Sequence, residues 1–324
     1  MAAIAQVHES PVSASLDRSE AAAIWRRFRR HKMGIAGLII LSILGLAALI
    51  IPAISPYSYR DVNPLIPFAP ANTMDPVRGI PHLFGTDYLG RDVFTRLFYG
   101  ERTSLFVSIF ATIFIVIIGV VTGAIAGFYG GWVDTVLMRF TDFMLALPLL
   151  PVYLFANKLF RPTTITPEDA FPVTMNLALI FVLFGWMGMS RLVRGSFLSL
   201  RTEAYVEASK ALGASNRRLI FRHLLPNSIA PVLVAATFSV GDFIIWECVL
   251  AYFGQGVTDF IVPSLGNMVV TAQVFVWNMD VLNPFEGIKA YLLIIPGTMI
   301  FLTVLSINYV GDALRNALDP HQTN

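Results

Sequence analysis

Residues 33–54 read MGIAGLIILSILGLAALIIPAI and contain no charged side chain. A helix needs about 20 consecutive apolar residues to cross the hydrocarbon core of a bilayer, so this stretch predicts a membrane-spanning helix. Its apolar run is longer than that of a secretory signal, and no small-residue cleavage site follows it. We therefore expect a retained first helix, preceded by a basic leader over residues 1–32.

Five further apolar stretches predict spans of the same kind. They are residues 103–128, 135–159, 174–190, 229–253 and 290–310. Pro148 and Pro151 interrupt the second of these five, and Gly185 and Gly188 loosen the next, which membranes tolerate where neighbouring helices satisfy the backbone. The sequence thus predicts an all-α integral membrane protein with six transmembrane helices.

The composition of the whole chain supports this fold class. Of its 324 residues, 56% are hydrophobic and 14% are charged, against about 25% charged in an ordinary soluble domain. This balance argues against both a water-soluble enzyme and a disordered chain. The single cysteine, Cys248, excludes a disulfide framework and a Cys-based metal site. A formal net charge of +2 gives no reason to expect nucleic acid as a partner.

The distribution of basic residues predicts the orientation. Six spans place both termini on one side of the membrane. Fifteen of the 23 lysine and arginine residues fall on that side, most of them in the leader and in the connection between the fourth and fifth spans. The positive-inside rule therefore predicts cytoplasmic termini. Within the leader, we expect residues 25–32 to anchor the chain at the anionic leaflet, with docking of a partner as the alternative.

The connection between the first two spans, residues 55–102, is predicted to lie outside. It holds six prolines before residue 82, which favour an ordered, extended segment over a helix. His82 with Asp87 or Asp92 could be metal ligands, but we favour a local hydrogen-bond network. The charged side chains that we expect to pair with one another there are Asp87, Arg91, Asp92 and Arg96.

Three glycines in the second span, Gly119, Gly123 and Gly127, recur every four residues. This spacing places them on one face of a helix, where another backbone can approach closely. The pattern predicts a packed helix bundle and indicates no particular substrate.

The connection over residues 199–227 predicts two short polar helices between two spans. Thr202 is expected to cap the first helix, Gly213 to end it with a positive φ, and Pro226 to start the next. Glu203, Glu207 and Lys210 lie at helical spacings along the first helix. A stiff lever and a solvated loop with ordinary charge pairs are both compatible with this pattern.

The same connection carries a family motif. Glu207-Ala-Ser, followed by Gly213 and then Leu225-Pro226, resembles the cytoplasmic EAA loop of ABC importer permeases, with Ser209 in place of the second alanine. The segment 222–227, RHLLPN, resembles the variant found in the peptide and nickel branch. Three further segments resemble the same branch: 83–92, 99–105 and 263–266. The C-terminal segment 311–320 does so too, and the resemblance covers roughly residues 25–320.

This resemblance implies the C-type permease subunit of a dipeptide, oligopeptide or nickel importer with the type I fold. Residues 33–102 would form the first helix and outer loop, and residues 103–320 the permease core. No GxxxxGK[ST] loop is present, so ATP would be bound by two separate ATPase subunits, and this chain would be non-catalytic and bind no cofactor. The implied ATPase-coupling residues are Glu203, Tyr205, Glu207, Ala208, Ser209, Leu212, Gly213 and Arg217.

The resemblance also implies a second homologous permease subunit, an extracytoplasmic substrate-binding protein, and a place in the inner or plasma membrane of a bacterium or archaeon. Alternating access would move the substrate. The segment 251–256, AYFGQG, and the outer connections 161–172 and 278–287 depart from the family pattern. The substrate itself therefore stays open.

Two acids, Asp242 and Glu247, lie inside the predicted fifth span. Acids within a membrane span are costly and point to function. We expect Glu247 near the outer end of the translocation pathway or against the partner subunit, with a structural pairing to Arg191 or Arg194 as the alternative. A rival function, an ion-coupled secondary transporter or channel, would use both acids. That rival predicts an inverted internal repeat, which the sequence does not show.

Overall fold

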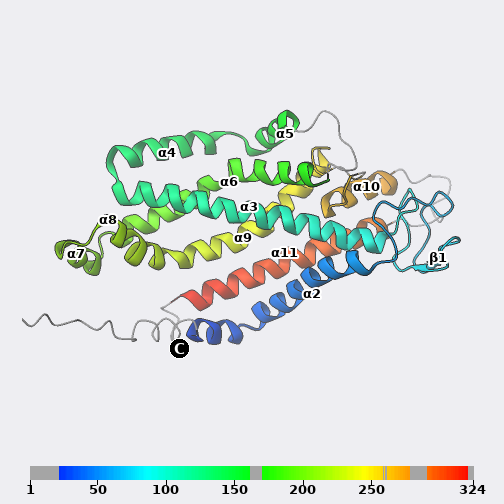
Figure 1. Cartoon of the computed structure of the whole chain (residues 1–324), viewed down its shortest axis with the longest axis horizontal. Helices are drawn as coiled ribbons and strands as arrows, with labels where there is room; N and C mark the ends of the chain where they lie inside the picture. Colours follow the sequence, from blue (N-terminus) through cyan, green and yellow to red (C-terminus); the bar gives the residue numbers. More distant parts are fainter. Residues whose placement is uncertain (1–21, 161–169, 258, 260, 278–289, 320–324) are drawn as a thin grey trace, which may run out of the picture.

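The computed structural model describes residues 22–160, 170–257, 259, 261–277 and 290–319. Figure 1 shows a bundle whose long helices run along one common direction. These helices are α2 (Lys32–Ile54), α3 (Val93–Tyr129), α6 (Ala170–Leu200), α9 (Leu225–Tyr252) and α11 (Tyr291–Leu318). Each is long and apolar enough to cross a membrane, in α9 together with the helical residues that precede it. The predicted helical membrane fold is confirmed.

The remaining predicted span, 135–159, is a bent pair of helices. It consists of α4 (Gly131–Ala146) and α5 (Leu149–Phe160), which meet at an angle of 89°. Pro148 lies at the break, where it disfavours a helical conformation of Leu147 and lacks an N–H of its own. The described chain therefore has five straight spans, or six if the bent pair counts as one.

The two ends of the bundle differ in kind (Figure 1). The short helix α7 (Ala204–Ala211) lies at the same end as the helical residues 22–30 and the end of α11. Phe28 packs there against Ala313 and Ala317. The strands β1 (Thr73–Met74) and β2 (Pro81–His82) lie at the opposite end, with α10 (Leu265–Trp277) nearby. The two ends of the described chain thus lie together, as an even number of spans requires.

The three glycines of α3 lie against α6. A Cβ added to Gly119 would come within 2.6 Å of the Met189 side chain, and one added to Gly127 within 2.6 Å of Phe197 Cβ. Gly123 faces Val193 at 2.8 Å. These distances are shorter than real side-chain contacts, so only glycine permits this approach. Close backbone packing of this kind drives helix association inside a bilayer.

The outer segment between α2 and α3 is ordered and mostly irregular. Its two strands pair antiparallel, with Thr73 opposite His82 and Met74 opposite Pro81. The small hairpin is an exception to the predicted all-α fold. In this irregular segment, side chains accept hydrogen bonds from backbone N–H groups that have no backbone partner. Ala69 N, for example, donates to Thr86 Oγ1 at 2.8 Å.

Candidate functional site

Within the segment predicted to couple to a partner, residues 201–215 form a compact structure at one end of the bundle, which we call the knob. Its helix α7 begins after Glu203, the N-cap residue, whose side chain makes no capping bond. The prediction that Thr202 caps this helix is wrong, because its hydroxyl donates to the Ser199 carbonyl at 2.9 Å. Gly213 follows the helix with φ +81°, as the sequence predicts.

Side chains tie α7 to the helix that follows it. The buried face of α7 is Val206, which is 3% exposed. Ser209 Oγ lies 3.4 Å from His223 Nε2, and Asn227 Nδ2 donates to Tyr205 Oη at 3.3 Å. Partial burial, and then the Glu203 carboxylate, raise the pKa of Tyr205, so its hydroxyl stays protonated at neutral pH. The knob therefore has contacts that can carry a displacement into the bundle.

The helix that receives these contacts runs on into the membrane without a loop. The short helix α8 (Asn216–Arg218) continues into a π-helical segment, η2 (Leu219–Leu224), and then into α9. Pro226 lies in the first turn of α9, as predicted, but no break separates the two helical pieces. π-Helical turns are rare and are frequently found at functional sites.

The outward surface of the knob includes two exposed large hydrophobic side chains. Leu212 is 89% exposed and Tyr205 is 42% exposed. The other predicted coupling residues are exposed as well, namely Glu203, Glu207, Ala208, Gly213 and Arg217, whereas Ser209 is half-buried. No ion pair forms among the residues of this described segment, which disfavours the alternative of a loop held by charge pairs. Exposed hydrophobic side chains among polar ones are typical of a protein-binding surface.

Glu247 lies in a buried polar environment formed by three helices. It is fully buried, and its carboxylate accepts hydrogen bonds from Ser264 Oγ at 2.5 Å and from Ser104 Oγ at 3.1 Å. The Gly266 N–H, in the first turn of α10, donates to the same carboxylate at 3.4 Å. Glu247 thus joins α3, α9 and the N-terminus of α10, where the helix dipole favours a negative charge. The described residues of these three helices enclose the Glu247 side chain.

The alternative pairing of Glu247 with Arg191 or Arg194 is wrong. Arg191 pairs with Asp142, and Arg194 pairs with both oxygens of Asp134. Both contacts join α6 to α4, so these arginines hold the bent pair of helices against the bundle.

Asp242 is exposed on α9. It makes no ion pair or hydrogen bond to the described part of the chain. Asp242 and Glu247 do not share a helix face, as their spacing predicts. An exposed carboxylate on a membrane-spanning helix calls for a water-filled pathway or a partner subunit beside it.

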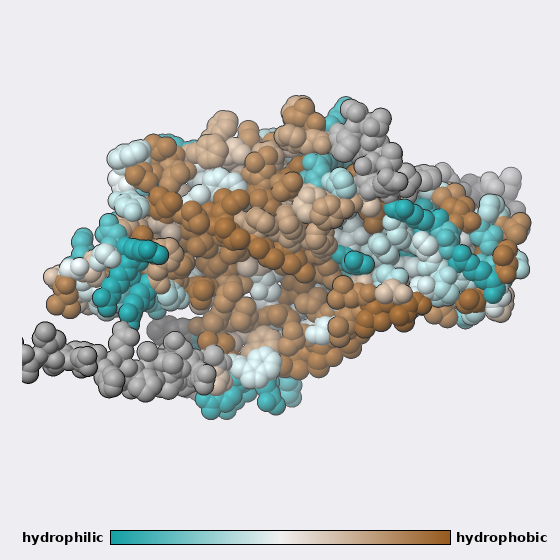
Figure 2. Space-filling model, in the orientation of Figure 1, coloured by the Kyte–Doolittle hydropathy of each residue, from teal (hydrophilic) through white to brown (hydrophobic). Residues whose placement is uncertain are grey.

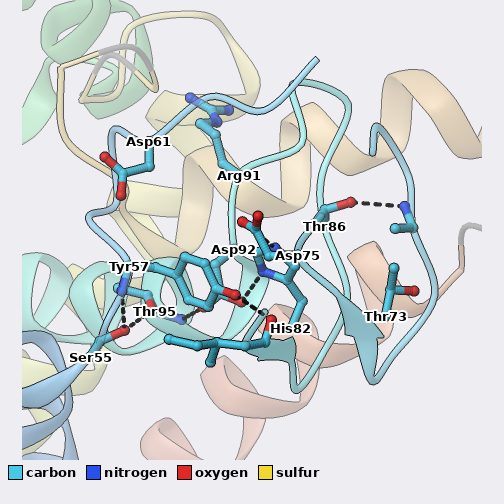
Figure 3. A network of polar contacts seen from close by, with 12 residues as sticks. Ser55, Tyr57, Asp61, Thr73, Asp75, His82, Thr86, Arg91, Asp92 and Thr95 are labelled. Atoms are coloured by element: carbon cyan, nitrogen blue, oxygen red, sulfur yellow. Dashed lines mark hydrogen bonds and ion pairs between the residues drawn. The ribbon is translucent and has the colours of Figure 1, made fainter. Parts of the chain in front are cut away.

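A polar network joins the outer segment to the start of α3 (Figure 3). His82 Nδ1 lies 2.9 Å from Asp92 Oδ1, and the His82 ring stacks on Tyr57 with centroids 4.2 Å apart. Asp92 is also the N-cap of α3 and accepts from Thr95 N at 2.7 Å. The described residues hold no group of three potential metal ligands. The local hydrogen-bond network predicted for this site is observed around His82 and Asp92.

A second network in this region is a buried cluster of two arginines and two acids. Arg91 bonds to Asp87 at 2.7 Å and to Asp259 at 2.6 Å, and Arg96 bonds to the other oxygen of Asp259. Burial lowers the pKa of Arg91, but the charges of Asp259 and Asp87 outweigh burial and leave it raised. The predicted pairing within residues 87–96 is confirmed in part, since Asp92 bonds to His82 instead. Asp259 was missed because it lies far away in sequence.

Two family profiles match the chain. One, described as "N-terminal TM domain of oligopeptide transport permease C", matches residues 19–71. The other, described as "Binding-protein-dependent transport system inner membrane component", matches residues 119–324. The chain belongs to this second family. The resemblance drawn from the motifs is therefore confirmed, and this member of the family is a permease component of an ABC importer in the inner membrane.

Similar proteins extend this relationship over nearly the whole chain. The dipeptide transport system permease protein DppC of Alkalihalophilus pseudofirmus is 35% identical over 94% of this chain and 92% of its own length. The oligopeptide transport system permease protein OppC of Bacillus subtilis is 34% identical over 92% of this chain and 90% of its own length. OppC of Escherichia coli is 34% identical over 93% of this chain and 92% of its own length. This permease family supplies non-catalytic membrane subunits, which work with ATPases, a second permease and a binding protein.

Proposed function

We propose that this permease forms half of a peptide translocation pathway and couples it to ATP hydrolysis through residues 199–227. The observation that carries the proposal is the exposed knob on α7. Its Leu212 side chain is 89% exposed, while side chains from α7 tie the knob to α9. A surface that is open to a partner and also joined to a membrane span fits a coupling element.

The mechanism follows from the rigidity of this connection. Each of two ATPase subunits would hold one α7 in a cleft, one from this chain and one from the second permease. Closure of the ATPases would bring the two knobs together. Because α6 leads into the knob, and α8, η2 and α9 leave it as one continuous helical run, the motion would pass into both helical segments. The pathway would then switch between inward-open and outward-open states by rigid-body rocking.

Peptides are the proposed substrates because the similar permeases from several bacteria are named for dipeptides and oligopeptides. An extracytoplasmic binding protein would deliver them to the end that carries β1 and β2. Asp242 is the proposed pathway residue, since it is exposed on α9 whereas Glu247 is enclosed. This assignment places α7 and both ends of the chain in the cytoplasm, in agreement with the positive-inside rule.

The experiment reconstitutes the permease with its ATPase, permease and binding-protein partners in liposomes. The variant Glu207→Ala combined with Leu212→Ser removes two exposed side chains that would contact the ATPase, and it leaves the buried face of α7 intact. We expect normal assembly and a loss of binding-protein-stimulated ATP hydrolysis of tenfold or more, about 1.4 kcal/mol of coupling. The control Asp312→Ala removes an exposed carboxylate at the same end of the bundle and should leave stimulation unchanged.

Two outcomes would contradict the proposal. One is full stimulation in the Glu207→Ala, Leu212→Ser variant. The other is transport by the purified chain alone down an ion gradient, abolished by Asp242→Asn, which would instead support a secondary transporter.

A further inference from the structure

Two adjoining apolar hollows lie along α2. The first, about 490 Å³, lies between α2, α3, α9 and α11, with Leu41, Gly45 and Ile109 among its lining residues. The second, about 370 Å³, lies toward the end of the bundle that carries α7, where Trp25 and Phe28 face Leu314 of α11. Leu233 lines both hollows, so they adjoin at α9, and we call the two together the apolar groove.

The groove follows from the way α2 packs. Near its start, α2 approaches α11 closely, because Gly37 leaves only 2.7 Å between an added Cβ and the Ser306 carbonyl. At its far end, α2 is tied to α3 by a 2.5 Å hydrogen bond between Ser55 and Thr95. Between these two fixed points, Gly45 has no neighbour within 4 Å of an added Cβ. The helix is thus held at both ends and leaves space in the middle.

Basic side chains surround one end of this groove. The helical residues 22–30 contribute Trp25 and Phe28 to its lining, and their neighbours Arg26, Arg29, Arg30 and Lys32 are exposed. Within the described parts of the chain, none of these four cations pairs with a carboxylate. Figure 2 shows hydrophilic residues in teal gathered at the start of α2, below the brown apolar band of the helices.

We propose that the apolar groove binds one anionic phospholipid of the cytoplasmic leaflet. An acyl chain would lie along α2 past Leu233 toward Gly45, and the phosphate would be held by Arg26 and Arg29. The inference rests on the proposed orientation, which places residues 22–32 at the cytoplasmic surface. Anionic lipids concentrate at that surface and attract basic segments next to a membrane span.

The observations favour a lipid over a protein helix as the occupant. The groove opens at the depth of membrane spans, where the surrounding solvent is acyl chain. Its rim adds positive charge that no carboxylate of the described residues pairs with, and a hydrophobic helix from another subunit would leave this charge unsatisfied. A single molecule with an apolar tail and an anionic head satisfies both parts of the site.

The test uses the full chain in its assembled transporter, reconstituted into nanodiscs. The probe is a phosphatidylglycerol with a photoreactive group in one acyl chain, and mass spectrometry locates the labelled peptides. We expect labelling near residues 41–45 and 233–240, and little labelling by a phosphatidylethanolamine with the same chains. Gly45→Leu should fill the groove and abolish this labelling, whereas Gly188→Leu, at an equally open glycine of α6, should not.

The charged rim is tested separately. Arg26→Gln with Arg29→Gln should reduce phosphatidylglycerol labelling roughly tenfold, and the paired change of the same residues to lysine should preserve it. Equal labelling by the two lipids, or unchanged labelling in Gly45→Leu, would overturn the proposal. Cross-linking of a Gly45→Cys variant to the second permease subunit would overturn it too, by assigning the groove to a protein helix. None of these readouts depends on ATP coupling, so failure here is distinct from failure of the proposed function.

Discussion

Replacing Asp259 by asparagine should weaken the attachment of the outer segment to the bundle. The Asp259 carboxylate accepts from both Arg91 and Arg96, whose side chains are only 4% and 3% exposed. Asparagine keeps the shape and removes the charge, so Asp87 becomes the single acid facing two buried arginines. Removing one partner of a buried charge network costs several kcal/mol, because the remaining charges stay desolvated.

The expected cost is about 3 kcal/mol, the lower end of the range for a broken buried pair, since Asp87 still bonds Arg91. For a chain of this size, that loss should lower the melting temperature by about 4 to 5 °C. Thermal unfolding in detergent can be followed through the reaction of Cys248, the single cysteine, with a thiol-reactive dye. Cleavage of the outer segment by an added protease should also become faster, because this segment would detach first.

The matched control is Asp61→Asn in the same segment. Asp61 pairs with Arg78 at 2.8 Å, but both side chains are 40% exposed. Exposed pairs contribute about 1 kcal/mol or less, so this melting temperature should fall by about 2 °C at most. If Asp259→Asn melts within 2 °C of the parent, or no lower than Asp61→Asn, the assigned stabilising role of the buried cluster is wrong.

Three further predictions follow from other contacts. Backbone N–H bonds from Arg78, and then from Val77, lower the pKa of Asp75 despite its burial. The ionised Asp75 therefore stabilises the folded state fully above its unfolded pKa of 3.8, and this contribution is lost as the pH falls through the lower folded pKa. Asp75→Asn should therefore lower the melting temperature at pH 7 and lose that effect in strong acid, which a pH series of melting curves would measure. Gly123→Leu should destabilise the bundle by about 1–3 kcal/mol through overpacking against α6, while Gly188→Leu should not, as compared by the same melting assay. Glu247→Ala should cost more than Glu247→Gln, because the amide keeps one acceptor oxygen for Ser264; equal melting temperatures would contradict this assignment.

The spans and the family could be predicted from the sequence because each depends on local information. An apolar run such as 33–54 fixes a membrane helix by its length alone, and the motif around Glu207 and Gly213 lies within one short segment. The glycine spacing in α3 identified a packing face by helical periodicity. These features need no knowledge of which distant residues meet.

The polar clusters could not be predicted in the same way. Arg96 and Asp259 are separated by 163 residues, and Glu247 meets Ser104 across 143 residues. The sequence marks such groups as costly inside a membrane protein but does not say which partners satisfy them. The predicted pairing of Glu247 with arginine is wrong because hydroxyl donors and a helix N-terminus can stabilise a buried carboxylate in place of a cation.

The uninterrupted helical run over residues 216–252 also constrains how this protein can change during evolution. One deleted residue in a continuous helix turns everything beyond it by about 100°. A deletion between Asn216 and Pro226 would therefore rotate the knob about the helix axis relative to Glu247 and the membrane spans. The contacts within the knob and those within the bundle would each stay the same. Only length changes close to whole turns would restore the phase, so lineages of this permease should vary freely in the outer connections and hardly at all in this length.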